Sequence, residues 1–217
     1  MVSSFDWFGR VYIINGIPGR REKISAELDR LGIPEYKRDY VRAKPPLAGL
    51  HMSNMRRNPQ GEFGCSLSHI KAVIYAANDR VQRPLFLEDD ILFAPDAEER
   101  LAKAIKDLEG RQWQVLYLGG HPCEDVERVG ECLVKVGRFS FAEAYSMPFP
   151  EVFIDYWLDR IGQEHAMYDQ ILGEYAKKTD GYSVFPIITR QPPGYSHVIR
   201  GHDDKTYCIE SGWRNHT

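Results

Sequence analysis

The chain has 217 residues, of which 43% are hydrophobic and 27% charged, so it is long enough to bury one hydrophobic core. Lys plus Arg number 28 and Asp plus Glu 31, and the net charge of −3 excludes a protein that attracts polyanions over its whole surface. Apolar residues are spread from end to end without repeats or low-complexity linkers, so we expect a single domain over residues 1–217.

The segment before Val11 has no basic stretch followed by a long apolar run, and no run elsewhere is long enough to span a membrane. The four cysteines show no C-x-x-C spacing and are few for this length. We therefore expect no signal peptide, no transmembrane segment, reduced thiols and a cytoplasmic protein.

The first predicted elements are a strand at 11–14, a helix that ends at Gly32, and a strand at 36–41. A long irregular connection is predicted from Pro45 to Gly61. The next helix is expected to have an inner face formed by four apolar residues at helical spacing. These are Leu67, Ile70, Ile74 and Ala77.

A buried strand at 84–87 leads into three acidic residues, and a helix ending at Gly110 precedes a strand at 115–118. This β-α-β-α-β order favours an α/β fold with a mostly parallel central sheet flanked by helices, whose ligand crevice lies at the carboxyl ends of the strands. We expect residues 1–120 to bind a nucleotide. Residues 121–217, with antiparallel strands at 132–136 and 139–145 and two later helices, are expected to form the acceptor side.

The acidic residues are Glu88, Asp89 and Asp90. On an extended backbone Glu88 and Asp90 point the same way, so together they present hard oxygens that suit Mg²⁺ or Mn²⁺. Such an ion leaves room for the oxygens of a diphosphate and neutralises charge on a departing nucleotide. The alternative is a solvated acidic turn after a strand.

Two other segments are candidate nucleotide-binding sites. Residues 61–72 place Ser66, Ser68 and His69 near an expected helix start, where free N–H groups meet an anion or a ribose. The alternative for His69, which projects to one side of the inner face, is a packed, hydrogen-bonded side chain. Asn15, Arg20 and Arg21 also lie between a strand and a helix, where arginine can clamp a pyrophosphate. The two arginines are alternatively solvated, since the loop lacks the G-x-G-x-x-G pattern.

The segment GEFGCSLSHIKA at 61–72, followed by LFLEDDILF at 85–93, resembles glycosyltransferase family 25, which contains lipopolysaccharide-type and collagen-type sugar transferases. The resemblance extends to YIIN at 12–15, AYSM at 144–147 and YDQ at 168–170. It also includes Pro186, Gln191 and Ser196 near the end.

The resemblance implies a GT-A-type fold, a UDP-sugar donor and inversion at the anomeric carbon. It implies Asp90 as the first metal ligand, with Glu88 and Asp89 supporting donor binding, and His197 or His202 completing the metal site. Asp169 in the YDQ block matches an acid of the family and is the candidate base for the acceptor hydroxyl. Its alternative role is to interact with the dipole of the following helix.

The sequence departs from the family at two places. The loop INGIPGRR, at 14–21, is shorter and less charged than usual, which leaves the donor sugar open. His197 follows Ser196 where the family has an acid.

The segment at 37–57 is strongly basic, with a single acid at Asp39, and we expect it to meet an anionic acceptor. A saccharide ranks first as the acceptor, a hydroxylated base in phage DNA second and protein hydroxylysine third. Nucleotidyl transfer uses the same carboxylates and metal and is the rival enzyme class, while an inactive sugar-binding module is the third reading. The basic residues are Lys37, Arg38, Arg42, Lys44, Arg56 and Arg57.

Overall fold

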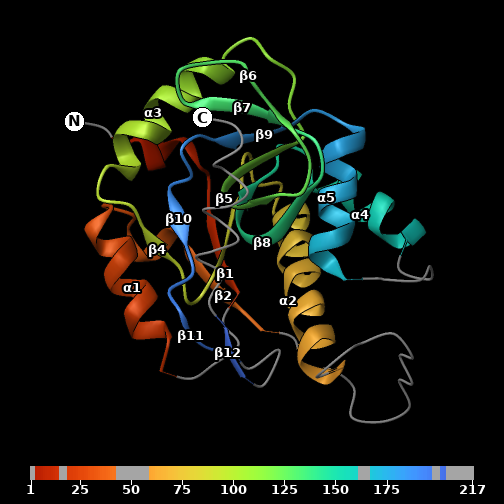
Figure 1. Ribbon diagram of the computed structural model, residues 1–217. Helices are drawn as coiled ribbons and strands as arrows, with labels where there is room; N and C mark the ends of the chain where they lie inside the picture. The colour runs from red at the N-terminus through yellow and green to blue at the C-terminus, as the bar shows by residue number, and fades with distance from the viewer. Residues whose placement is uncertain (1–2, 15–18, 43–58, 161–166, 197–200, 204–217) are drawn as a thin grey trace.

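The computed structural model describes residues 3–14, 19–42, 59–160, 167–196 and 201–203, and shows a twisted sheet with helices on both faces (Figure 1). Its helical elements are η1 (Ser4–Trp7), α1 (Arg21–Arg30), η2 (Glu35–Lys37), α2 (Pro59–Asn78), α3 (Ala97–Leu108), α4 (Pro150–Arg160) and α5 (Tyr168–Lys178). Strands β1 to β6 are Val11–Ile14, Arg38–Val41, Leu85–Glu88, Leu92–Phe93, Val115–Pro122 and Val126–Arg128. Strands β7 to β12 are Leu133–Val136, Phe139–Ser146, Gly181–Val184, Thr189–Arg190, Gly194–Ser196 and Gly201–Asp203.

The main sheet of the described residues has the strand order β2-β1-β3-β8-β5-β9-β7-β6. The pairings of β1 with β2 and β3, and of β5 with β9, are parallel, whereas β8 is antiparallel to both of its neighbours. Followed across the sheet, only β8 and β7 run against the other strands, so the predicted mostly parallel α/β sheet is confirmed. Strand β8, which follows β7 in the chain, lies between β3 and β5 in space.

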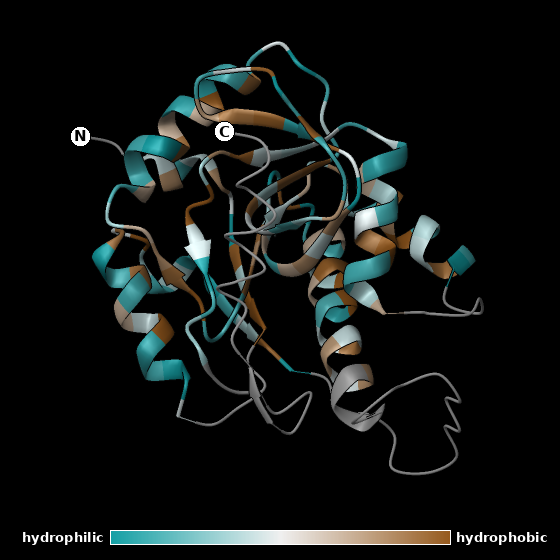
Figure 2. Ribbon diagram, viewed as in Figure 1, coloured by the Kyte–Doolittle hydropathy of each residue, from teal (hydrophilic) through white to brown (hydrophobic). Residues whose placement is uncertain are grey.

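Successive residues of the inner strands face opposite layers. In β1, Val11 and Ile13 pack toward α1 and α3, while Tyr12 and Ile14 pack toward α2, α4 and α5. All four are buried, as expected for a sheet covered on both faces. In Figure 2 the central strands are mostly brown, whereas α1 and α3 alternate between teal and brown along their length.

Three predicted details of the elements are wrong. Pro34 is followed by the 3-10 turn η2, so the second strand begins at Arg38 rather than Tyr36. The helix expected after an irregular connection that ends at Gly61 begins at Pro59, which is suited to a first helical turn. Ile74 is 37% exposed, because α2 packs through Ser66, His69, Ile70, Val73 and Ala76 instead.

None of the helices in the described part of the chain is both long and apolar enough to cross a membrane. Cys65, Cys123 and Cys132 are free thiols.

Candidate active site at the end of strand β3

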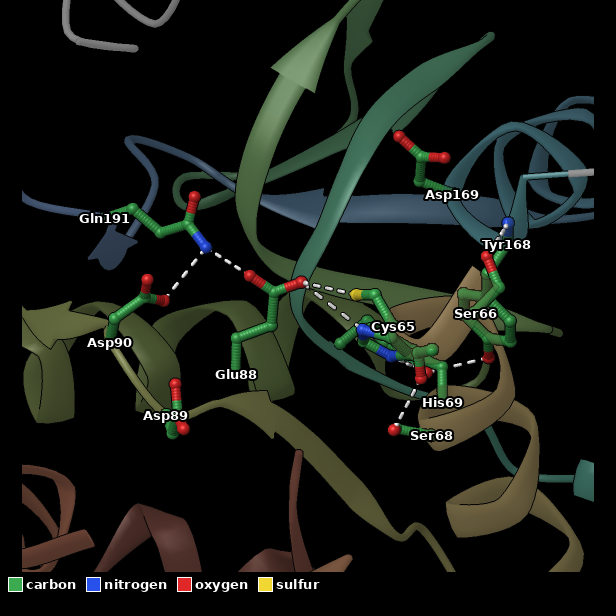
Figure 3. A network of polar contacts seen from close by, with 12 residues as sticks. Cys65, Ser66, Ser68, His69, Glu88, Asp89, Asp90, Tyr168, Asp169 and Gln191 are labelled. Carbon is green, nitrogen blue, oxygen red and sulfur yellow. Dashed lines mark hydrogen bonds and ion pairs between the residues drawn. The ribbon is translucent and has the colours of Figure 1, made fainter. Parts of the chain in front are cut away.

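Two acidic side chains at the end of β3 converge on one amide nitrogen (Figure 3). Gln191 Nε2 donates to Glu88 Oε2, and it lies 3.0 Å from Asp90 Oδ1. Glu88 and Asp90 therefore do face a common point, as their spacing predicts. The point lies at the carboxyl end of a sheet strand, where ligands of open α/β sheets bind.

Gln191 reaches this point because β10 closes onto β5. Ile188 N–H donates to Leu118 O at 2.8 Å, and a Cβ built on Gly119 would collide with the Thr189 hydroxyl and with Glu143. Only glycine at position 119, which has no side chain, allows the backbone of β5 to lie this close to the side chains of Thr189 and Glu143. The close packing holds the residues after Thr189 beside Glu88.

Arg20, at the start of α1, brings a positive charge to the site. Its Nη1 lies 2.6 Å from Asp90 Oδ2 and 3.2 Å from Asp89 Oδ1. Asp89 is only 5% exposed, so this ion pair is partly shielded from water. Among the described residues, Arg20 thus pairs with two of the three neighbouring carboxyl groups, those of Asp89 and Asp90.

Arg21 is placed differently from its neighbour. Its guanidinium lies 3.9 Å from the centroid of the Tyr40 ring and 3.8 Å from Glu35, and its side chain is 61% exposed. The structure therefore brings Arg20 to the carboxylates and turns Arg21 toward β2.

The serines predicted at a helix start lie inside α2. The free N–H groups of α2 belong to its first turn after Pro59, well before Ser66 and Ser68. Ser68 donates to Gly64 O within its own helix at 2.7 Å, and Ser66 accepts from Tyr168 N–H at 3.2 Å. The expectation that this segment forms a helix start is wrong, because the helix extends further toward the N-terminus.

His69 is fully buried, at 1% exposure, rather than at one side of the inner face. Its Nδ1 lies 3.1 Å from the Tyr145 hydroxyl and its Nε2 lies 3.3 Å from Glu88 Oε1. The ring stacks on Tyr168 at a centroid distance of 4.7 Å. His69 is packed and hydrogen-bonded, and it also joins α2 to the acidic end of β3.

The two tyrosines behind His69 stay protonated. Burial raises the pKa of Tyr145 well above its usual value, with the neighbouring Tyr168 adding to the effect, and burial likewise raises the pKa of Tyr168. Tyr145 O–H donates to Tyr168 Oη at 2.7 Å. The lone pairs of Tyr145 are thereby left to accept from His69.

Asp169 lies on the first turn of α5, apart from Glu88 and Asp90 in Figure 3. Its Oδ1 accepts from Gln170 N–H at 2.9 Å, as expected for an acid that interacts with free N–H groups of a helix start. The adjacent Tyr168 nevertheless stacks on His69, so the YDQ block and the histidine block meet in space.

The structure does not describe the side chains of three other predicted site residues. Asn15 and His197 lie outside the described residues, and for His202 the structure describes only the backbone, in β12, which pairs with β11.

The predicted basic segment contains two side chains that are not free to meet an acceptor. Arg38 has a 2% exposed side chain and pairs with Asp29 at 2.6 Å, and Lys37 pairs with Asp6 at 2.8 Å. Lys37 and Arg38 therefore present paired charges rather than free ones, because buried or partly buried cations need acidic partners. Residues 43–58 lie outside the described part.

Two residues at the site were not predicted there. Gln191 was noted only as part of a distant pattern, and its contact with Glu88 depends on β10 packing. Cys65 stands four residues before His69, a spacing that places both on one helix face, and this signal was available in the sequence.

The model of a known family, described as glycosyltransferase family 25 (LPS biosynthesis protein), matches residues 11–152, which is more than half of the chain. The chain belongs to glycosyltransferase family 25. The match runs from β1 into α4 and includes His69 and the Glu88–Asp90 carboxylates, so these residues lie within a glycosyltransferase domain. Asp169 and Gln191 follow the matched region.

Individual relatives of this family 25 chain are distant. Mouse procollagen galactosyltransferase 2 is 31% identical over 62 residues, which are 28% of this chain and 10% of that protein. The chain thus matches a small part of that relative's length.

Three solved structures have a similar outline. UDP-glucose pyrophosphorylase complexed with UDP-glucose is 11% identical, with a TM-score of 0.47, over 81% of this chain and 72% of that one. A197 from STIV is 11% identical, with a TM-score of 0.46, over 81% of each chain. A glycosyltransferase involved in glycosylation of the major capsid of PBCV-1 is 9% identical, with a TM-score of 0.38, over 82% and 93%. All three TM-scores are below 0.5, so these structures are no basis for assigning an activity.

Proposed function

We propose that this chain transfers a sugar from a nucleoside diphosphate sugar, with UDP as the nucleotide, to a hydroxyl group of a saccharide, with inversion and with a requirement for Mn²⁺ or Mg²⁺. The observation that carries the proposal is the convergence of Glu88 and Asp90 on Gln191 Nε2, with Arg20 against the other oxygen of Asp90. Carboxylates and a guanidinium at the end of a sheet strand suit a metal-bound diphosphate.

The side chains present fit a hard divalent cation. Glu88 Oε2 and Asp90 Oδ1 already face a single amide nitrogen that donates to both, and carboxylate oxygens are the ligands that Mg²⁺ and Mn²⁺ prefer. Asp90 and Glu88 would hold the ion, which would neutralise part of the diphosphate charge. His197 or His202 remains the proposed additional ligand.

Arg20 is proposed to bind the donor diphosphate. Its guanidinium sits at the start of α1, beside the carboxylates, and a planar guanidinium binds phosphate oxygens through two parallel hydrogen bonds. Exchanging its present partners, Asp89 and Asp90, for the diphosphate would place its charge where the leaving group becomes more negative.

The reaction is a single displacement. The acceptor oxygen forms a bond to the anomeric carbon as the bond from that carbon to the phosphate oxygen breaks, and the nucleoside diphosphate leaves with the electron pair. Inversion needs a base for the proton of the acceptor hydroxyl, and we propose Asp169. Support comes from the contact between Tyr168 and His69, which holds the first turn of α5 beside the helix that carries His69.

A donor screen tests the proposal. Purified protein with Mn²⁺ is offered UDP-galactose first, since the mouse relative is named a galactosyltransferase, and then other UDP-sugars, together with saccharide, hydroxylysine-peptide or hydroxymethylated DNA acceptors. The expected result is UDP release with a mass gain of one sugar on a saccharide.

Other outcomes identify the rival functions. Pyrophosphate release from a nucleoside triphosphate would identify nucleotidyl transfer, and donor binding without turnover under any condition would identify a binding module. Full transfer in the presence of a chelator would contradict the metal requirement.

A further inference from the structure

A second group of candidate metal ligands lies on the opposite side of Glu88 from Gln191. The ligand atoms of Cys65, His69 and Glu88 all lie within 4.8 Å of one another. Glu88 Oε1 is 3.3 Å from His69 Nε2 and 3.9 Å from Cys65 Sγ, while Glu88 Oε2 faces Gln191. The two oxygens of Glu88 thus face two different groups.

The separations fit a single tetrahedral ion. Zinc bonds of about 2.0–2.3 Å to nitrogen, oxygen and sulfur place neighbouring ligand atoms roughly 3.3–3.6 Å apart. The distances from Glu88 Oε1, 3.3 and 3.9 Å, are close to these values, and all three ligand atoms lie within 4.8 Å of one another, so side-chain rotation brings them to bonding distance of one ion. Cys65 and His69 are four residues apart on α2, so the rigid helix holds both ligands on one face.

The hydrogen bonds of His69 aim a lone pair at this position. Tyr145 O–H is donated to Tyr168, so Tyr145 accepts from His69 Nδ1–H, and in the neutral ring Nε2 carries a lone pair. That lone pair and Glu88 Oε1 are both acceptors at 3.3 Å, an arrangement that requires a proton or a metal cation between them. A histidine fixed through its other ring nitrogen is the usual arrangement of a metal ligand.

We propose that Cys65, His69 and Glu88 bind a zinc ion, separate from the Mg²⁺ or Mn²⁺ of the transfer reaction. One sulfur, one imidazole nitrogen and one carboxylate oxygen select zinc over the hard cations. On binding, the Cys65 thiol loses its proton to solvent and coordinates as thiolate. The zinc ion joins α2 to the end of β3 and holds Glu88 in place, with its other oxygen directed toward Gln191. This inference goes beyond the proposed function.

Cobalt substitution tests the site without any activity assay. Chelator-treated full-length protein is titrated with Co²⁺, and a thiolate ligand is expected to give a sulfur-to-cobalt charge-transfer band at one equivalent. Cys65→Ser and Cys65→Ala should both lose the band while far-ultraviolet circular dichroism is unchanged. Cys123→Ser is the matched control, since this thiol is exposed and outside the group, and should keep the band.

Zinc affinity gives the second measurement. Competition with a chromophoric chelator should show one tight zinc site. In Cys65→Ser the zinc affinity should fall by at least about 100-fold, because loss of a residue that merely hydrogen-bonds to a metal ligand already costs up to about 100-fold. Asp90→Asn should leave the band and the zinc affinity unchanged, although it removes the proposed transfer metal. The proposal is overturned if no tight zinc site exists, if the band survives in both Cys65 variants, or if Asp90→Asn abolishes it.

Discussion

Ser66 in α2 accepts a hydrogen bond of 3.2 Å from the backbone N–H of Tyr168, 102 residues further along the chain. The contact satisfies a free N–H group at the start of α5 and fixes that helix against α2. It also fixes the position of the next residue, the proposed base, relative to His69 and Glu88.

Replacement of Asp169 by Asn tests the proposed base. Asn still accepts a hydrogen bond from the helix start, so the fold should persist, whereas it cannot take a proton from the acceptor. We expect kcat to fall by about 100- to 10,000-fold with the donor KM little changed. The matched control is Asp155→Asn, an exposed acid on α4, and near-normal kcat in Asp169→Asn would assign Asp169 to the helix alone.

Replacement of Asp90 by Asn tests the metal requirement. The amide loses the negative charge that attracts the cation but keeps the shape of the side chain, and we expect transfer to fall by about 100-fold or more. UDP release is measured against Mn²⁺ concentration in the variant and the wild type. Identical metal dependence in the two proteins would remove Asp90 from the metal site.

Replacement of Arg20 by Ala tests the donor contact. Because Arg20 lies at the carboxylates and Arg21 lies against Tyr40, Arg20→Ala should reduce kcat/KM for the donor by about 100-fold, and Arg21→Ala should have little effect. Initial rates at varied donor concentration give both values. Equal losses in the two variants would show that general positive charge, rather than the position of Arg20, matters.

Replacement of Gln191 by Glu adds a carboxylate between Glu88 and Asp90. Repulsion should lower the Tm in chelator by at least about 3 °C, and Mn²⁺ should restore it, since a cation replaces the lost N–H donor. Arg190→Gln makes the same change in net charge at an exposed neighbour and is the control. A Tm of the Gln191 variant that does not respond to Mn²⁺ would contradict a cation site here.

His121 gives a prediction for pH. Burial lowers its pKa below the usual 6.5, and its Nδ1 is buried without a hydrogen-bond partner in the described part of the chain. Below about pH 6.5 the unfolded chain takes up a proton that the folded form resists, so stability falls as the pH decreases toward the lowered pKa. His121→Phe removes this proton uptake, and its Tm should decrease less than that of the wild type between about pH 7.5 and about pH 5. Parallel Tm curves for the two proteins would contradict the assignment.

The sequence predicts the parts of the fold that depend on local pattern. Apolar runs placed the strands at Val11 and Leu85 correctly, and the acids after Leu87 were expected at a strand end. The faces of α2 were harder to predict, because His69 and Ile74 both occur at helical spacing from apolar neighbours. Only contacts with α4, α5 and the sheet decide that His69 is buried and Ile74 exposed.

Strand order and site partners depend on distant parts of the chain. No local pattern shows that β8 inserts between β3 and β5, or that β10 delivers Gln191 to Glu88. The spacing of Cys65 from His69, by contrast, can be read directly from the sequence. Cys65 becomes a candidate metal ligand only because the structure places Glu88 beside both residues.

The position of β8 in the sheet also affects how the chain folds during translation. Strand β3 has β1 on one side and β8 on the other, and β8 comes more than fifty residues after β3 in the chain. During translation, the edge of β3 that later pairs with β8 has unpaired backbone N–H and C=O groups until residues 139–146 have left the ribosome. A truncated product ending before that point has no partner for this edge, and it exposes an apolar strand to other nascent chains.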